Sequence, residues 1–341
     1  MSINRENIRS VLVYVGLDRL GDGLLKLPFA RGLRIAFPNA HLTWFAGKET
    51  SVYAGVLAPL VADALDDVIE YGGVGLHPSE LIKPRPLKNH RFDLVIDTQR
   101  IFWTSLSAWR IRHDQFISPA AKFLLSSVKP RTGYKSPKAM QRQMLDLLEI
   151  ASGTTFETPT KLNLDIPQPH HDMAADLLPA GPRYIGFAPG SGGRPKCWPL
   201  DRYIALAEMA EASGAVPVFL IGPQEEEWAT QIKTALPNAL LPLQHGNGAR
   251  AHGYNPLFTI ALGTRLSGAV SNDSGIAHMM AVAGTPLIAL YGPTVYEKFP
   301  PMTDVITVIR AETYGSREMT AIPLDGVNQA LQTLLASSHA S

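Results

Sequence analysis

The sequence predicts an α/β protein built from two Rossmann-like domains with parallel sheets. Strand-like apolar runs alternate with helical spacings from one end to the other, as expected when helices connect parallel strands. The chain has 341 residues, whereas a single hydrophobic core stops growing at about 250–300 residues. A proline-rich polar stretch divides the alternating pattern into two sets.

The first set begins with an apolar run at 11–15, and apolar residues then recur at helical spacing over 24–37. Further short strands are predicted at 42–45, 68–70, 93–97 and 115–117. The proline-rich stretch gives a predicted linker at 166–182, with domains at 1–165 and 183–341. Two such domains would place a ligand cleft between them, at the carboxyl ends of the strands.

The second set starts with a strand at 184–187 and a helix at 199–212, which has proline at its start and Gly214 after its end. The next strand, at 216–221, contains Pro217, which suits only a strand start or an edge strand. A final amphipathic helix is predicted at 324–335, free to pack back on the first domain.

Composition bounds the class of protein. Hydrophobic residues make up 45% of the chain, and no apolar run reaches the length of a membrane span. No stretch of the signal-peptide kind precedes the first strand. The single cysteine, Cys197, rules out an intrachain disulfide and a cysteine-based metal cluster. A cytoplasmic location is expected.

Charge is unevenly distributed. Residues 83–142 contain thirteen Lys and Arg against three Asp, a net +10, which leaves −9 for the rest of a chain whose total is +1. This asymmetry indicates an anionic partner, such as a phosphorylated glycolipid, an anionic membrane surface or nucleic acid. The alternative is a solvated face whose charges maintain solubility.

The most informative segment is 268–294, which is typical of strand, polar turn, helix and strand. Its polar residues, Asp273 and Ser274, gather where the helix begins, and a helix N-terminus favours a phosphate. Ser274 and His278 share one helical face, and Gly275 leaves room for close approach. We interpret this segment as a diphosphate-binding element. The alternative is a helix cap at Asp273 or Ser274, with a packed histidine.

Between the first strand and helix, Asp22 stands between Gly21 and Gly23. A carboxylate at this place can accept a proton from an attacking hydroxyl, although it could equally cap the helix. The glycines do not follow the dinucleotide spacing, which disfavours an NAD-dependent enzyme.

The glycine-rich loop 189–199 ends in Lys196, which could neutralise a leaving diphosphate. No Walker motif closes the loop, so nucleotide hydrolysis is not expected; the alternative is a connection with a solvated lysine. After the next strand, Gln224 and Glu225 occupy a position where carboxylates bind ribose hydroxyls. Acidic residues there also complement a helix dipole.

Taken together, segments 17–22, 189–199, 222–226, 271–294 and the tail 319–323 resemble glycosyltransferase family 9. Its best-known members are the ADP-heptose:lipopolysaccharide heptosyltransferases. The resemblance spans nearly the whole chain in the right order. The stretch 244–257, where adenine recognition is expected, is less typical of the family.

The resemblance implies a GT-B fold, with two Rossmann-like domains facing a central cleft. The N-terminal domain would bind the acceptor and the C-terminal one the donor, with inverting transfer and without a cofactor or an essential metal. The residue matching the family's base is Asp22. The residues that would hold the nucleotide diphosphate and sugar are Lys196, Asp273, Ser274, Gly275 and His278, with Gln224 or Glu225 at the ribose.

The implied donor is ADP-heptose and the implied acceptor an anionic lipopolysaccharide-core glycolipid, with no nucleic acid as partner. Peripheral contact with the cytoplasmic face of the inner membrane is then expected. The basic residues predicted to meet the acceptor are Arg100, Arg131, Lys135, Lys138 and Arg142.

Two other functions fit parts of the pattern. A nucleotide-sugar epimerase or hydrolase of the same architecture would need no lipid acceptor, and the +10 segment argues against it. A non-catalytic carbohydrate-binding scaffold would not require Asp22, Lys196 and His278 together.

Overall fold

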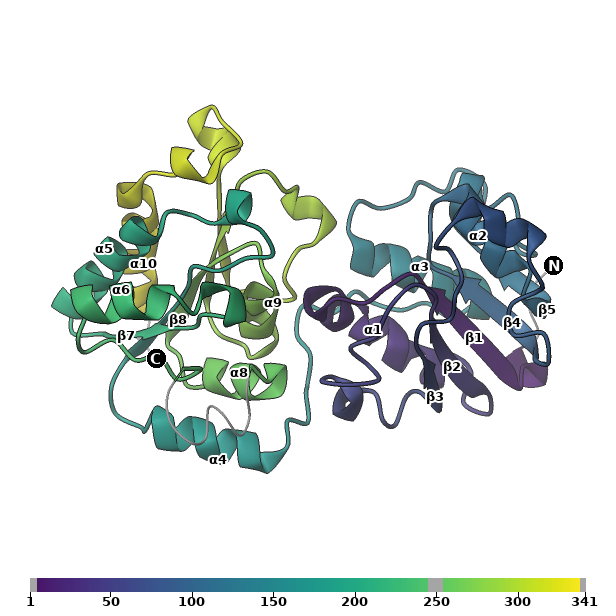
Figure 1. The fold of residues 1–341 in the computed structure, drawn as a ribbon, viewed down its shortest axis with the longest axis horizontal. Coiled ribbons are helices and arrows are strands. Elements are labelled where there is room, and N and C mark those ends of the chain that lie inside the picture. The colour runs from purple at the N-terminus through teal and green to yellow at the C-terminus, as the bar shows by residue number, and fades with distance from the viewer. Residues whose placement is uncertain (1–4, 245–253, 338–341) are drawn as a thin grey trace. The chain divides into compact units, whose positions relative to one another are not determined.

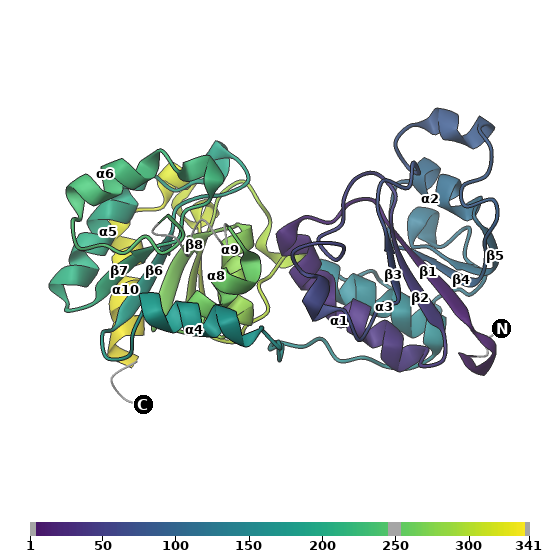
Figure 2. The ribbon, with the colours of Figure 1, turned by 60° about the horizontal axis from the view of Figure 1, so that its bottom comes forward.

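The computed structural model describes residues 5–244 and 254–337, and the chain divides into two compact units, Met1–Pro159 and Thr160–Ser341 (Figure 1). Each unit contains one five-stranded sheet in which every pair of neighbouring strands is parallel. Helices cover both faces of each sheet (Figure 2). Two Rossmann-like α/β domains are therefore confirmed.

The elements of the first unit are β1 (Ser10–Val15), α1 (Leu20–Ala36), β2 (His41–Ala46), β3 (Asp67–Ile69), β4 (Arg91–Asp97), α2 (Phe102–Trp109), β5 (Arg112–Ile117) and α3 (Met140–Ser152). The strand order is β3-β2-β1-β4-β5. Helices α1 and α3 contact each other on one face of the sheet, and α2 lies on the other (Figure 2).

The strands of the first unit form because their apolar runs can be buried on both sides. In β1, residues 11–15 are all buried, as expected for a parallel strand with helices on both faces. The rings of Tyr14 and Phe45 lie 5.9 Å apart between centroids, and Val95 and Phe116 belong to the same apolar cluster. This core fixes the carboxyl ends of β1 and β4 next to each other.

The elements of the second unit are α4 (Gln168–Leu177), β6 (Tyr184–Ala188), α5 (Leu200–Ala212), β7 (Val216–Phe219), α6 (Trp228–Ala235), α8 (Pro256–Gly263), β8 (Gly268–Asn272), α9 (Gly275–Val282), β9 (Leu287–Tyr291), β10 (Ile306–Arg310) and α10 (Leu324–Ser337). The strand order is β10-β9-β8-β6-β7. Strand β7, which contains Pro217, is an edge strand, one of the two positions predicted for it.

Residues 166–182, predicted as a linker, include helix α4, which packs against α8 within the second unit. The prolines of this stretch start the helix: Pro167 is the N-cap and Pro169 lies in the first turn, where proline is tolerated. The final helix α10 contacts α5, β8 and β9, so it packs on its own unit.

Within residues 5–244 and 254–337, every helix is too short or too polar to span a membrane.

Candidate active site

In each sheet there is one point at which the strand order reverses, and the loops leaving the carboxyl ends of the strands diverge there. In the first unit this point lies between β1 and β4, and in the second between β6 and β8. Open α/β sheets bind ligands at such points. The predicted residues follow these strand ends: Asp22 comes after β1, in the first turn of α1, Lys196 after β6 and Asp273 after β8.

In the second unit, the loop after β6 is fixed to the end of β8 by the fully buried Asn272. The Nδ2 of Asn272 donates to the Pro189 carbonyl at 2.7 Å. Its Oδ1 accepts from the N–H of Trp198 and from the hydroxyl of Tyr203, both at 3.1 Å. Sequence reasoning did not select Asn272, although a carboxamide at the end of a largely apolar strand is a usable signal.

The ammonium of Lys196 lies at the start of α9, with its Nζ 3.3 Å from Oδ2 of Asp273. The hydroxyl of Ser191, in the same loop as Lys196, donates to the Asp273 carbonyl at 2.9 Å. The Lys196 side chain is 38% exposed, so its charge remains accessible. The structure thus brings the loop cation and a helix N-terminus together, and both favour an anion.

Ser274 is the N-cap of α9, and its Oγ accepts from the N–H of Ala277 at 3.5 Å. The capping interpretation therefore holds for Ser274. Gly275 opens the helix behind it, and His278, one turn further on, is only 6% exposed. His278 accordingly belongs to the packed interior, as the alternative interpretation of this segment expected.

Of the two candidates after β7, Glu225 is buried and Gln224 is exposed. A Cβ built on Gly190 would lie 2.6 Å from Cδ of Glu225, so the missing side chain lets the loop lie directly against the carboxylate. Burial raises the pKa of Glu225, whereas the N–H groups of Gly222 and Ser191 and the charge of Arg194 lower it. Glu225 is therefore the carboxylate placed at the glycine-rich loop.

In the first unit, Asp22 lies in the first turn of α1, which begins at Leu20, rather than in a turn before the helix. The N-cap is Arg19, so Asp22 does not cap the helix. Asp22 is partly exposed and its carboxylate complements the helix dipole. A partly exposed carboxylate after β1 is accessible to a substrate.

Directly beneath this turn is a buried polar cluster that sequence reasoning missed. Asp18 forms an ion pair with Lys26, and the exposed fractions of the two side chains are 0% and 9%. Oδ2 of Asp18 also accepts from the indole N–H of Trp44 at 2.7 Å and from the hydroxyl of Ser51 at 3.0 Å. The signal for this cluster is a lysine inside the apolar part of α1, one turn after Asp22.

The first turn of α1 is also held from the segment after β2. The hydroxyl of Tyr53 donates to the Gly23 carbonyl at 2.7 Å. A Cβ on Gly23 would lie 2.4 Å from Cγ2 of Val52, so glycine is required there. The backbone next to Asp22 is therefore held firmly in position.

Strand β4 ends at Asp97, which is fully buried and shapes the neighbouring loop. Its carboxylate accepts from the N–H of Gln99 at 2.8 Å and from the hydroxyl of Ser118 at 2.7 Å. Burial raises the pKa of Asp97 to about 6, although the hydroxyls of Ser105 and Ser118 and the N–H of Gln99 lower it. Asp97 thus holds the loop that leads to Arg100.

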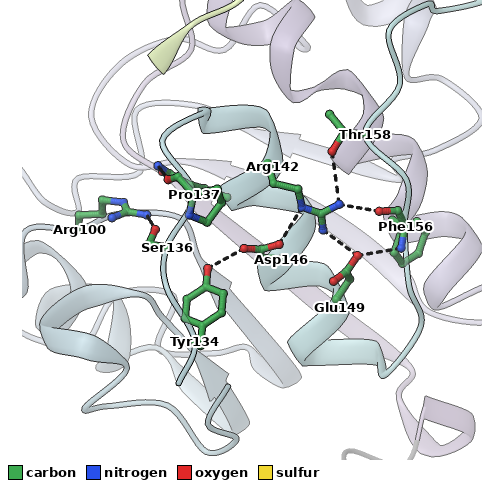
Figure 3. A network of polar contacts seen from close by, with 10 residues as sticks. Arg100, Tyr134, Ser136, Pro137, Arg142, Asp146, Glu149, Phe156 and Thr158 are labelled. Atoms are coloured by element: carbon green, nitrogen blue, oxygen red, sulfur yellow. Dashed lines mark hydrogen bonds and ion pairs between the residues drawn. The ribbon is translucent and has the colours of Figure 1, made fainter. Parts of the chain in front are cut away.

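Figure 3 shows where two of the predicted acceptor residues lie. Arg100 donates to the hydroxyl of Ser136 at 2.7 Å, which ties the loop 130–138 to the carboxyl end of β4. The hydroxyl of Tyr134 donates to Asp146 at 2.7 Å and anchors the same loop on α3. The other predicted acceptor residues on this loop, Arg131, Lys135 and Lys138, are exposed.

Arg142 has a different environment from the one expected of an acceptor residue. Its guanidinium pairs with Asp146 and Glu149, each at 2.7 Å (Figure 3). It also donates to the Phe156 carbonyl at 2.6 Å and to the Thr158 hydroxyl at 3.4 Å. These bonds hold the segment after α3, so we assign Arg142 to the structure of the unit.

In the described part of the chain, no three His, Cys, Asp or Glu side chains are grouped so as to hold a metal ion. Most of the stretch 244–257, where adenine recognition was expected, lies outside the described residues.

Comparisons with known proteins match the chain to one family. Residues 83–322 match the family described as Glycosyltransferase family 9 (heptosyltransferase). Lipooligosaccharide heptosyltransferase 2 of Haemophilus influenzae is 36% identical over 37% of this chain and 36% of its own length. The lipopolysaccharide core heptosyltransferase OpsX of the same organism is 23% identical over 82% of this chain and 78% of its own length. The match thus spans about a third of the first of these relatives.

Solved structures share the fold of the whole chain. A glycosyl transferase of family 9 from Veillonella parvula superimposes with a TM-score of 0.71 at 21% identity, covering 96% of this chain and 97% of the other. The heptosyltransferase WaaC of E. coli, solved with ADP, gives 0.65 at 18% identity, with 95% and 99% covered. These similarities support the predicted fold class.

Proposed function

Because this chain belongs to glycosyltransferase family 9, we propose that it transfers heptose from ADP-heptose to an acceptor of the lipopolysaccharide-core type. One observation carries the proposal: Lys196 and the N-terminus of α9 meet at the point where the strand order of the second unit reverses. A cation beside free backbone N–H groups suits a diphosphate.

The donor diphosphate binds against Lys196 and the N-terminus of α9, formed by Asp273, Ser274 and Gly275, with His278 behind it on the same helix. Glu225 accepts hydrogen bonds from the ribose hydroxyls, because its carboxylate is the one held at the glycine-rich loop. Gln224 is exposed and has no part in this proposal.

Transfer proceeds with inversion and without an essential metal. The acceptor oxygen forms a bond to the anomeric carbon while the bond from that carbon to the phosphate oxygen breaks. Asp22 takes the proton of the acceptor hydroxyl, and ADP leaves with the electron pair. Lys196 and the N–H groups of α9 stabilise the charge that develops on the departing diphosphate.

The first unit binds the anionic acceptor beside Asp22. Arg100 and the exposed residues Arg131, Lys135 and Lys138 lie on loops at the carboxyl end of its sheet and supply the positive charge. In this proposal the protein works at the cytoplasmic face of the inner membrane, through peripheral contact with its glycolipid acceptor.

The donor assignment is tested by calorimetric titration of ADP, UDP and GDP without added metal. ADP is expected to bind best, and Lys196→Ala to weaken it by about 10- to 100-fold, because a charge-assisted contact is lost. Lys233→Ala, at a partly exposed lysine on α6, is the matched control. A preference for UDP or GDP would reject the ADP donor, and no binding of any nucleotide would favour the non-catalytic scaffold.

The ribose assignment has a test of its own. Wild-type protein is expected to bind ADP more tightly than 2′,3′-dideoxy-ADP, by about tenfold or more, because the carboxylate of Glu225 loses its partners. Glu225→Gln should reduce this difference, whereas Gln224→Ala should preserve it. If Gln224→Ala were the variant that removed the difference, the two roles would be reversed.

A further inference from the structure

A cavity lies in the first unit, at the end of its sheet opposite to Asp22 and Arg100. The cavity has a volume of about 500 Å³, within the range of small-molecule sites. Its polar and aromatic lining, which defines what we call the arginine cavity, consists of Arg85, Arg91, Trp109, Arg110, Arg112 and His113. Leu81, Leu106 and Ile111 complete the wall.

The location separates the arginine cavity from the proposed active site. Arg91 and Arg112 are the first residues of β4 and β5, whereas Arg100 follows the carboxyl end of β4. The seven residues of β4 span about 20 Å at about 3.3 Å per residue. A ligand in the cavity therefore does not occupy the acceptor position proposed above.

The arginine side chains of the arginine cavity do not stabilise the fold through ion pairs alone, because some of them lie beside like charges or without acidic partners. Arg91 and Arg112 are direct partners in the register of β4 and β5, an arrangement of like charges that opposes folding. Arg91 has an ion pair with Asp114. Arg85 and Arg112 are exposed, and no described acidic side chain pairs with either.

The wall of the cavity is built in advance of any ligand. Arg110, at the end of α2, donates to the carbonyls of Glu80 and Lys83 and so fastens the turn Pro78–Ile82 against this helix. The His113 ring is fixed by its Nδ1, 2.7 Å from the Ile111 carbonyl, and lies 6.0 Å from the Trp109 ring. These anchored groups leave Arg85 and Arg112 as the adjustable cations.

We propose that the arginine cavity binds a phosphate ester group, carried by a phospholipid headgroup or by a soluble phosphorylated compound. Two guanidinium groups without acidic partners match a dianion, and arginine forks bind phosphate oxygens in pairs. The neighbouring Ile82 is 90% exposed and Trp109 is 43% exposed. Exposed apolar side chains beside cations suit the interface of an anionic bilayer.

Anion binding in the arginine cavity can be measured through the pKa of His113, because this residue lines the cavity. Burial, together with the charges of Arg91 and Arg85, lowers the pKa of His113, while the Ile111 carbonyl and Asp114 raise it. A bound anion favours the protonated ring, so pyrophosphate should raise the pKa of His113 in an NMR titration, with the resonance assigned by His113→Gln. The pKa of His113 therefore reports an anion bound in the cavity itself.

The double variant Arg85→Gln/Arg112→Gln is expected to bind pyrophosphate about 10- to 100-fold more weakly. The affinity is measured as the pyrophosphate concentration that gives half of the His113 response. Arg9→Gln/Lys122→Gln removes the same charge from exposed positions of the same unit outside the cavity and should leave the affinity unchanged. Equal losses in both variants, or no response of His113 to pyrophosphate, would overturn the proposal.

Vesicle flotation distinguishes the two sources of the phosphate group. Binding to vesicles containing phosphatidylglycerol, lost in the cavity variant but not in the control, identifies a lipid headgroup. If the cavity variant and the control bind vesicles equally, while only the cavity variant loses the response of His113 to pyrophosphate, the ligand is a soluble phosphorylated compound. Both variants should retain sugar transfer to a soluble acceptor, so failure of this proposal is distinguishable from failure of the proposed function.

Discussion

Asp22→Asn is expected to lower the rate of sugar transfer by about 10²- to 10⁴-fold, the usual contribution of a general base. Asparagine keeps the shape of the side chain but cannot accept the proton of the acceptor hydroxyl. Since Asp22 lies in the first unit and the proposed nucleotide site in the second, ADP affinity should not change. Single-turnover transfer and ADP calorimetry on the same preparation measure the two effects separately.

The matched control for this experiment is Asp63→Asn, which neutralises an exposed carboxylate of the same unit. It should leave both transfer and ADP binding at the wild-type level. If Asp22→Asn turned over as fast as Asp63→Asn, another group would have to act as the base. If Asp22→Asn lost ADP binding as well, Asp22 would have a role in the donor site.

The second large effect is on stability. Asp18→Ala is expected to lower the free energy of unfolding by about 3–5 kcal/mol, the cost of breaking a buried ion pair from one side. The substitution leaves the ammonium of Lys26 buried without its carboxylate, and removes the acceptor for Trp44 and Ser51. Urea unfolding, with the transition of the first unit followed separately, measures the loss.

Two further variants test whether the loss of stability in Asp18→Ala comes from the unpaired charge of Lys26. Asp18→Leu/Lys26→Met removes both charges and should cost less than Asp18→Ala alone, because no uncompensated charge remains buried. Asp114→Ala breaks the exposed pair with Arg91 and should cost at most about 1 kcal/mol. If the double variant were as unstable as Asp18→Ala, the loss would come from packing rather than from the stranded charge.

Much of the fold could be predicted from periodicity and turn chemistry. Short apolar runs separated by helical spacing identified the strands of the first sheet and most of those of the second, because parallel strands are buried on both faces. Strand β10 was not predicted, since its residues are only partly buried. The chemistry of Pro217 was compatible with an edge strand. Helix α4 was missed because prolines were interpreted as linker residues, whereas Pro167 and Pro169 stand at the one end of a helix that accepts them.

The candidate site was only partly visible in the sequence. The loops carrying Lys196 and Asp273 could be identified separately, but their meeting depends on the order of strands in the sheet. Asn272 and Asp18 were not found, because several of their partners come from distant parts of the chain: Pro189 for Asn272, and Trp44 and Ser51 for Asp18. The ion pair of Arg142 with Asp146 could also have been read from the sequence, since an acid four residues later is the spacing of a helical ion pair.

The division of the chain has a consequence for how such proteins diversify. Each unit has its own sheet and its own core, and along the described residues the chain passes from one unit to the other between Pro159 and Thr160. A single recombination event at that junction would exchange one complete unit for its counterpart from a relative. Two halves of a gene with this layout can therefore be inherited from different ancestors, without dividing either hydrophobic core.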